Sequence, residues 1–396
     1  MGMGASAARA QVKIVGQRTV TAARATGARA KFEPAGDGVY HGASLPDAWN
    51  ENGLRRQIAD YNAAAGKKIS VVTWFASAYE NGRMTSWSQN YAPNLARVKR
   101  LGAVSLIKFS TQDYAYDSTH KIADLKLIAN GTWDEYFKQS ALAIKQFGGP
   151  VFISINHEMN GNWYPYSQAA PGSRTTAADY VAAWRRIVDV FNKNGATNVA
   201  WVWAPNVPDV GGISYQSYYP GDNYVDWIGV SLYSGNDPRA LDGIYNEYSA
   251  KKPFFITEWA TAPVQNGYNA RFPGEVAWVN NFFQTLNQNY PRVKAISWFN
   301  WNKPGEGDFR LQRVPAQARA YADDVAATRY LDSAGSLIGN SSQPAIPRLD
   351  VPSREVILRD VTRVVNPKPV AAPVKKTQWD KIKWQSVPTE RVRTQK

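Results

Sequence analysis

Short apolar runs that favour β-strands alternate with longer amphipathic stretches along most of this 396-residue chain. Several runs are almost continuously apolar, which is typical of parallel strands that helices cover. The eight runs that we expect to be strands are Gly38–Ala43, Ile69–Ala76, Val104–Phe109, Val151–Glu158, Val199–Pro205, Trp227–Tyr233, Phe254–Trp259 and Ala295–Asn300.

Helical patterns fill the stretches between these runs. Thr176–Asn192 repeats apolar residues at helical spacing, and Thr175 or Thr176 is suited to cap its first turn. A last helix is expected over Pro315–Tyr330, with proline in its first turn. Eight β-then-α units over roughly 290 residues match the size of a (β/α)₈ TIM barrel. A doubly wound open sheet is the alternative, although it usually has fewer strands.

The two ends of the chain differ from the middle in composition. Residues 1–37 are rich in Ala, Gly, Arg and Thr and are interpreted as a basic arm or linker. Residues 333–396 are rich in Pro, Val and basic side chains and are expected to form a mostly extended tail. The barrel is therefore expected to occupy residues 38–332.

The net charge of +14 is concentrated at these ends. Residues 1–38 carry +4 and residues 341–396 carry +7, which leaves only +3 for the middle. A nearly neutral barrel suits a neutral substrate. The basic tail, with Trp379 and Trp384, could contact phosphate, but a solvated or partner-bound tail is the favoured interpretation, so no nucleic-acid partner is expected.

Composition and motifs exclude several other classes of protein. The chain has no Cys and three His, which excludes disulfides and thiolate metal sites and disfavours a histidine-rich one. His157-Glu158 could begin a zinc motif, but Gly161 stands where the second histidine is required. We expect no metal and no cofactor. No run of 18 apolar residues predicts a membrane span, and the first residues lack the apolar segment of a secretory signal.

Two glutamates follow predicted strands at matching positions. Glu158 closes the fourth run and Glu258 closes the seventh. The carboxyl ends of barrel strands share one face, so both side chains are expected at one open end. Glycoside hydrolysis uses such a pair, with one carboxyl protonated and the other ionised. A structural ion pair is the alternative for either residue. The 15 Trp and 21 Tyr suit a sugar-binding cleft.

The segment around Glu158 resembles the acid/base signature of glycoside hydrolase family 26. It reads His-Glu-Met-Asn-Gly, then one residue, then Trp163-Tyr164-Pro165-Tyr166. Further stretches are similar to the family in the same order: Trp201–Asn206, Tyr219–Gly229, Thr257-Glu258, Trp298–Asn300 and Asp308–Arg310. The resemblance covers about residues 38–332 and implies a (β/α)₈ barrel that hydrolyses β-linked polysaccharides with retention of configuration.

The resemblance also implies roles for individual residues. Glu158 would be the acid/base and Glu258 the nucleophile. His157 would hydrogen-bond near the nucleophile or the sugar, and Tyr233 would orient Glu258, since a donated hydroxyl favours an ionised carboxylate. Four further residues are expected to contact the substrate. The indoles of Trp163 and Trp298 would form platforms for the sugar. Trp203 could equally belong to the core, and His41 follows the first predicted strand.

The substrate and the context stay open. Mixed-linkage β-glucan, mannan and β-1,3-xylan are the candidates, and Trp163-Tyr164-Pro165-Tyr166 is closer to the glucan- and xylan-cutting members than to mannanases. An extracellular or virion-associated depolymerase, with the basic arms docking on a protein assembly, is one interpretation of the ends. A non-catalytic carbohydrate-binding barrel is the alternative to an enzyme.

Overall fold

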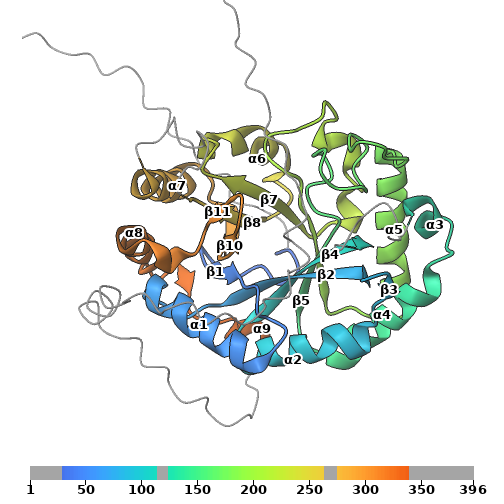
Figure 1. Ribbon diagram of the computed structural model, residues 1–396, viewed down its shortest axis with the longest axis horizontal. Helices are drawn as coiled ribbons and strands as arrows, with labels where there is room; N and C mark the ends of the chain where they lie inside the picture. The colour runs from blue at the N-terminus through green and yellow to red at the C-terminus, as the bar shows by residue number, and fades with distance from the viewer. Residues whose placement is uncertain (1–28, 114–123, 263–273, 339–396) are drawn as a thin grey trace, which may run out of the picture.

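A computed structural model describes residues 29–113, 124–262 and 274–338. Eight parallel strands in these residues close into a barrel, because β1 pairs with both β2 and β9 (Figure 1). Each strand lies where an apolar run predicted one, so the (β/α)₈ fold is confirmed. The barrel strands are β1 (Val39–Ser44), β2 (Val71–Glu80), β4 (Val104–Asp113), β5 (Val151–Ile155), β6 (Val199–Trp203), β7 (Trp227–Tyr233), β8 (Phe254–Ala260) and β9 (Val293–Phe299).

Helices surround the barrel (Figure 1), except for the short last one, which packs against the interior core at one end. They are α1 (Glu51–Ala65), α2 (Ala92–Arg100), α3 (Leu125–Ala129), α4 (Asp134–Phe147), α5 (Ala177–Lys193), α6 (Asp242–Tyr248), α7 (Glu275–Asn289), α8 (Pro315–Val325) and α9 (Gly335–Ile338). One unit departs from the expected pattern. The connection from β6 to β7 is described throughout, and it contains the 3-10 helices η2 (Tyr215–Tyr218) and η3 (Asp222–Tyr224) in place of an α-helix.

Helix α5 begins where its sequence predicted. The Thr176 hydroxyl accepts from the Asp179 N–H, and the Asp179 carboxylate accepts from the Thr176 N–H. This reciprocal pair satisfies two backbone donors that the first turn leaves free. The cap fixes the start of the helix, whose apolar side then packs on the barrel.

Helix α8 is shorter than predicted. It ends at Val325 instead of continuing to Tyr330. Tyr330–Leu331 forms the short strand β12, which pairs in parallel with Val39 and Tyr40 of β1. Pairing with the barrel edge therefore overrides the helical pattern in the last turn.

Two apolar cores stabilise the barrel. The larger lies between strands and helices, and the smaller fills the barrel interior near the start of the strands. Interior residues include Tyr40, Leu106, Phe152, Trp227 and Phe255. Because side chains alternate along a strand, these residues identify which positions of each strand face inward.

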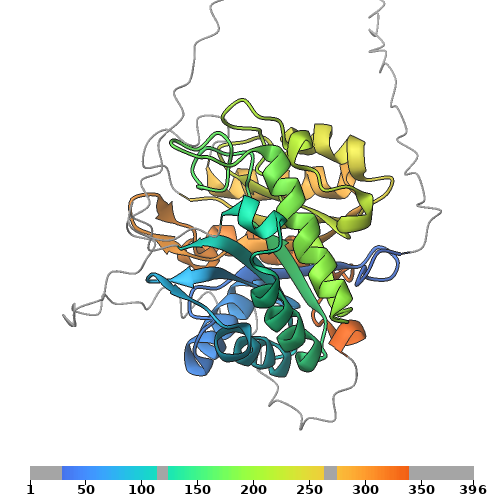
Figure 2. The ribbon, with the colours of Figure 1, turned by 90° about the vertical axis from the view of Figure 1, so that its right-hand side faces the viewer.

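Residues 29–37 belong to the barrel and not to a separate arm. Phe32 packs edge-on against Phe152 inside the barrel, with ring centroids 5.6 Å apart. The Trp227 indole donates to the Lys31 carbonyl at 2.7 Å, and Glu33 forms a 2.7 Å ion pair with Arg292. Figure 2 shows this segment at the end of the barrel opposite the β10–β11 hairpin (Asn302–Lys303 and Gly307–Asp308). The expected boundary at residue 38 is therefore too late.

The remainder of both basic ends, residues 1–28 and 339–396, lies outside the described residues. At the other boundary, Ala334 is buried in the interior core and Leu337 packs against it, so the domain continues past residue 332. None of the described helices has the length and apolar character needed to cross a membrane.

Candidate active site

Glu158 lies in a tight turn directly after β5. Its backbone φ is 55°, and that of Asn156 is 48°, in the left-handed region that costs an ordinary residue about 1–2 kcal/mol. Neighbouring strands impose this conformation. The Asn156 side chain accepts from the Thr111 N–H of β4 at 2.8 Å, and the Glu158 N–H donates to the Ala204 carbonyl after β6 at 2.7 Å. The turn therefore fixes the starting point of the Glu158 side chain.

Glu258 reaches the barrel interior through an irregularity in β8. Phe255 faces the interior, so simple alternation would turn Thr257 inward and Glu258 outward. The register with β7 shifts at this point, because Val230 pairs with Ile256 but Ser231 pairs with Glu258. Such a bulge re-aims the following side chain. Glu258 consequently lies inside the barrel, with only 5% of its surface exposed.

Tyr233, the last residue of β7, donates its hydroxyl to Glu258 Oε2 at 2.6 Å. Burial and the nearby Glu258 charge raise the pKa of Tyr233 well above its ordinary value. The hydroxyl thus keeps its proton and remains a donor. This is the contact that the predicted orienting role requires.

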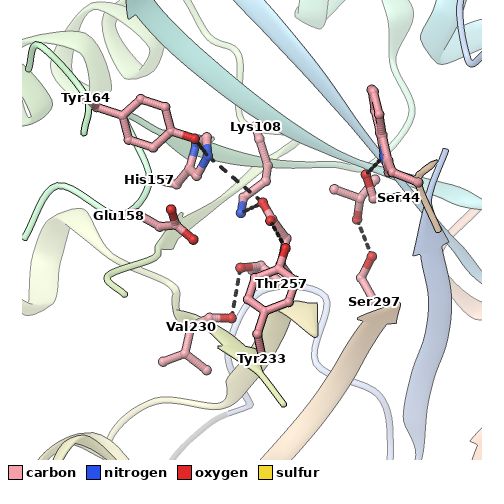
Figure 3. Close-up of polar contacts among 12 residues, drawn as sticks. Ser44, Lys108, His157, Glu158, Tyr164, Val230, Tyr233, Thr257 and Ser297 are labelled. Carbon is pink, nitrogen blue, oxygen red and sulfur yellow. Dashed lines mark hydrogen bonds and ion pairs between the residues drawn. The ribbon is translucent and has the colours of Figure 1, made fainter. Parts of the chain in front are cut away.

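Lys108 is a site residue that the sequence analysis missed. It lies on β4, is fully buried, and its ammonium donates to Glu258 Oε1. Figure 3 shows Lys108 of β4, His157 and Glu158 of the turn after β5, and Tyr233 of β7 converging on one point. The sequence did carry a signal, because Lys108 is a single charge within a buried run and has the same alternation as inward-facing Val104 and Leu106.

His157 lies beside Glu258 without a hydrogen bond to it. Its Nε2 is 4.0 Å from Glu258 Oε1 and hydrogen-bonds with the Tyr164 hydroxyl at 3.1 Å. Burial, followed by the Lys108 charge, lowers the pKa of His157 well below its ordinary value. The ring is therefore neutral and adds no charge to the site.

The Glu158 carboxyl is poised to hold a proton. Burial raises its pKa, and the nearby Glu258 charge raises it further. Three groups lower this pKa: the Lys108 charge, the Ser231 hydroxyl and the Trp163 indole, which donates to Glu158 Oε2 at 3.0 Å. Trp163, expected as a sugar platform, thus also hydrogen-bonds directly to Glu158.

The structure corrects the positions of three predicted substrate contacts. Trp298, Trp203 and His41 are fully buried, so none can present a ring to a sugar. All three follow an inward-facing residue and point outward, toward the helices. Trp298 packs on Trp259, Trp203 on Tyr219 and Tyr248, and His41 on Tyr61 of α1. Burial accordingly lowers the pKa of His41 to about 3.

Half-buried aromatic rings line one side of the glutamates instead. The ring centroid of Phe75, on β2, lies 5.7 Å from that of His157 and 5.8 Å from that of Trp301. The Phe309 ring centroid lies 5.7 Å from that of Tyr233, the residue that donates to Glu258, so Phe309 extends this side toward Glu258. Because rings at this depth keep part of their surface accessible, Trp301 and Phe309 are better placed than Trp298 to meet a sugar face.

These features define what the site can do. One carboxyl is favoured in its protonated form, and a second accepts from an ammonium and a phenol. That division suits an acid and a nucleophile acting on one bond. Within the described ranges, no group of three or more His, Asp or Glu residues could hold a metal ion.

Comparisons with known proteins agree with this geometry. The family model described as glycosyl hydrolase family 26 matches residues 76–301. Endoglucanase H of Acetivibrio thermocellus is 31% identical over 283 residues, which is 68% of this chain and 29% of that protein. The mannan endo-1,4-beta-mannosidase A and B of Caldalkalibacillus mannanilyticus is 33% identical over 159 residues, 39% of this chain and 28% of that protein. The match thus spans under a third of either relative.

A solved structure shares the fold at lower identity. The Bacillus subtilis mannanase BCman superposes with a TM-score of 0.55 and 17% identity, over 79% of this chain and 92% of the mannanase chain. At that identity the likeness concerns the fold alone.

Proposed function

Because this chain belongs to glycosyl hydrolase family 26, we propose that it is an endo-acting β-glycanase that cleaves its polysaccharide with retention of configuration. Glu258 is the nucleophile and Glu158 is the acid/base. The reaction proceeds by two displacements at the anomeric carbon.

In the first displacement, Glu258 attacks the anomeric carbon and the glycosidic C–O bond breaks. Glu158 gives its proton to the departing oxygen. The hydrogen bond from Tyr233 to Glu258 weakens as Glu258 loses its negative charge, because the protonated leaving group departs neutral and the charge ends on Glu158. The product is a glycosyl ester on Glu258 and an ionised Glu158.

In the second displacement, Glu158 removes a proton from water, and the water oxygen attacks the same carbon. The ester bond to Glu258 breaks and its carboxylate is restored. Glu158 ends the cycle protonated, so no cofactor is consumed.

The observation that carries this proposal is the unequal environment of the two carboxyls. Glu258 accepts from Lys108 and Tyr233, whereas burial and the Glu258 charge raise the pKa of Glu158. A non-catalytic sugar-binding barrel has no need for two buried glutamates in such unequal environments.

Our first candidate substrate is a mixed-linkage β-glucan, followed by β-1,3-xylan and mannan. A relative that matches over 283 residues is named Endoglucanase H, and the aromatic segment after Glu158 also favours a glucan. Phe75, Trp301 and Phe309 would supply the apolar faces against which the sugar rings lie.

The test is incubation of the protein with these three polysaccharides. We expect a rapid fall in viscosity on one of them and β-configured new reducing ends in proton NMR. Glu158→Ala and Glu258→Ala should each lose this activity, whereas Glu135→Ala, an exposed change on α4, should retain it. Azide should restore turnover to Glu258→Ala as an α-glycosyl azide. Cleavage at wild-type rates by either site variant would contradict the proposal.

A further inference from the structure

The stability of the fold does not explain why a lysine is buried at position 108. A buried ammonium loses its hydration, and an apolar residue of similar length would avoid that cost. Its strand neighbours Leu106 and Val104 are apolar at the equivalent inward positions. The reason for a cation here is therefore sought in its contacts. The ammonium donates to Glu258 Oε1 and lies over the face of the Phe75 ring, 5.8 Å from its centroid.

Among the described residues, the other groups around this ammonium add no net positive charge to the site. His157 is neutral and Tyr233 is protonated. On the β10–β11 hairpin, Lys303 and Glu306 pair with each other at 2.8 Å and contribute no net charge. The Lys108 charge thus faces two groups that can be anionic, Glu258 and Glu158.

We propose that Lys108 is a positioning residue that stabilises whichever glutamate is ionised at each stage of the reaction. This inference rests on the proposed function. In the free enzyme Lys108 pairs with Glu258. In the glycosyl-enzyme, where Glu258 is an uncharged ester, the same ammonium stabilises ionised Glu158.

The charges balance at each stage. Before attack, Glu158 is neutral, Glu258 carries −1 and Lys108 carries +1. After attack, the proton of Glu158 has left with the departing oxygen, so Glu158 carries −1 and the ester is neutral. The negative charge has moved from one glutamate to the other while the positive charge has stayed, and their sum is zero in both states.

The pKa of Glu158 falls when the negative charge of Glu258 is lost. The Glu258 charge raises that pKa in the free enzyme, and this contribution disappears when Glu258 becomes an ester. The lowering contribution of Lys108 persists. Glu158 is thereby a stronger acid in the intermediate, where it has to act as a base toward water.

The experiment uses a 2,4-dinitrophenyl glycoside of the sugar that the wild-type protein cleaves. This leaving group departs without a proton, so the second displacement limits turnover and a burst of dinitrophenol precedes it. The fall of kcat on the acidic side of its pH profile, the acidic limb, then reports the ionisation of Glu158 in the intermediate. We compare Lys108→Met and Lys108→Gln, which remove the charge, with Lys108→Arg, which keeps it.

We expect the acidic limb of Lys108→Met and Lys108→Gln to move to higher pH by about 1–3 units, the usual effect of an adjacent opposite charge. Lys108→Arg should keep the wild-type limb. The matched control is Lys294→Met, because Lys294 is also a buried lysine but donates to the Gly36 carbonyl at the far end of the barrel. Its limb should not move.

A uniform loss of rate with unchanged limbs in both neutral variants would overturn the inference, because that is the behaviour of a packing residue. If Lys108→Met fails to fold by circular dichroism, Lys108→Gln decides the question, since it retains a donor for Glu258. A wild-type protein that cleaves no glycoside would overturn the proposed function itself, which is a separate outcome.

Discussion

The Tyr233 hydroxyl donates to Glu258 Oε2 at 2.6 Å, from the last residue of one strand to a bulged position of the next. We expect Tyr233→Phe to lower kcat by about 10–100-fold, since a hydrogen bond to a charged group contributes about 1.5–3 kcal/mol. Steady-state kinetics on the preferred polysaccharide measures this. Tyr245→Phe, which removes a hydroxyl that accepts from the Arg292 N–H, is the control and should keep wild-type turnover. Equal turnover in both variants would contradict the orienting role of Tyr233.

The indole of Trp163 lowers the pKa of Glu158 through its hydrogen bond. Its loss in Trp163→Phe should raise that pKa. The first displacement needs protonated Glu158, so the alkaline limb of kcat/KM should move to higher pH. A pH–rate profile from pH 4 to 9 tests the direction. A shift to lower pH would mean that Trp163 favours the protonated form instead.

Asn156 combines a left-handed backbone with buried hydrogen bonds to Thr111. Both Asn156→Gly and Asn156→Ala lose the side-chain hydrogen bonds. Glycine adopts the left-handed backbone conformation without strain, whereas alanine adopts it with strain. We expect Ala to destabilise the barrel more than Gly, by about 1 kcal/mol, because left-handed geometry costs a residue with a Cβ about that much. Thermal melting of the two variants gives the order, and a more stable Ala variant would be inconsistent with an imposed turn.

The ion pair between Glu33 and Arg292 holds the N-terminal segment against the barrel. Glu33→Gln leaves Arg292 largely buried without its partner, which should lower the melting temperature by several degrees. Glu51→Gln disrupts exposed pairs with Arg55 and Arg100 and should change it little. If both variants melt together with the wild type, residues 29–37 do not stabilise the domain.

Sequence reasoning predicted the barrel because each strand is an apolar run of the right length and the runs are evenly spaced. It predicted Glu158 and Glu258 because strand ends share one face. It failed at Trp298, Trp203 and His41 for one physical reason. A continuously apolar strand does not reveal which residues face inward, and all three have the outward alternation.

Other features depend on contacts between distant segments or on irregular strand pairing, which the sequence does not reveal. The bulge beside Thr257 turns Glu258 inward, and the sequence of this strand contains no glycine or proline that would predict the bulge. The contact of Phe32 with the barrel interior depends on packing between distant segments, which local composition does not report. Lys108, by contrast, could have been found, since a lone lysine in a buried run is a strong signal.

The central claim is that Glu258 forms a covalent bond with the sugar. A 2-deoxy-2-fluoro glycoside with a dinitrophenyl leaving group slows breakdown of that intermediate, and peptide mass spectrometry locates the label. We predict a single adduct on the peptide that contains Thr257-Glu258, which disappears when the trapped protein turns over. A label on Glu158, or stoichiometric release of α-configured product with no adduct, would contradict this account.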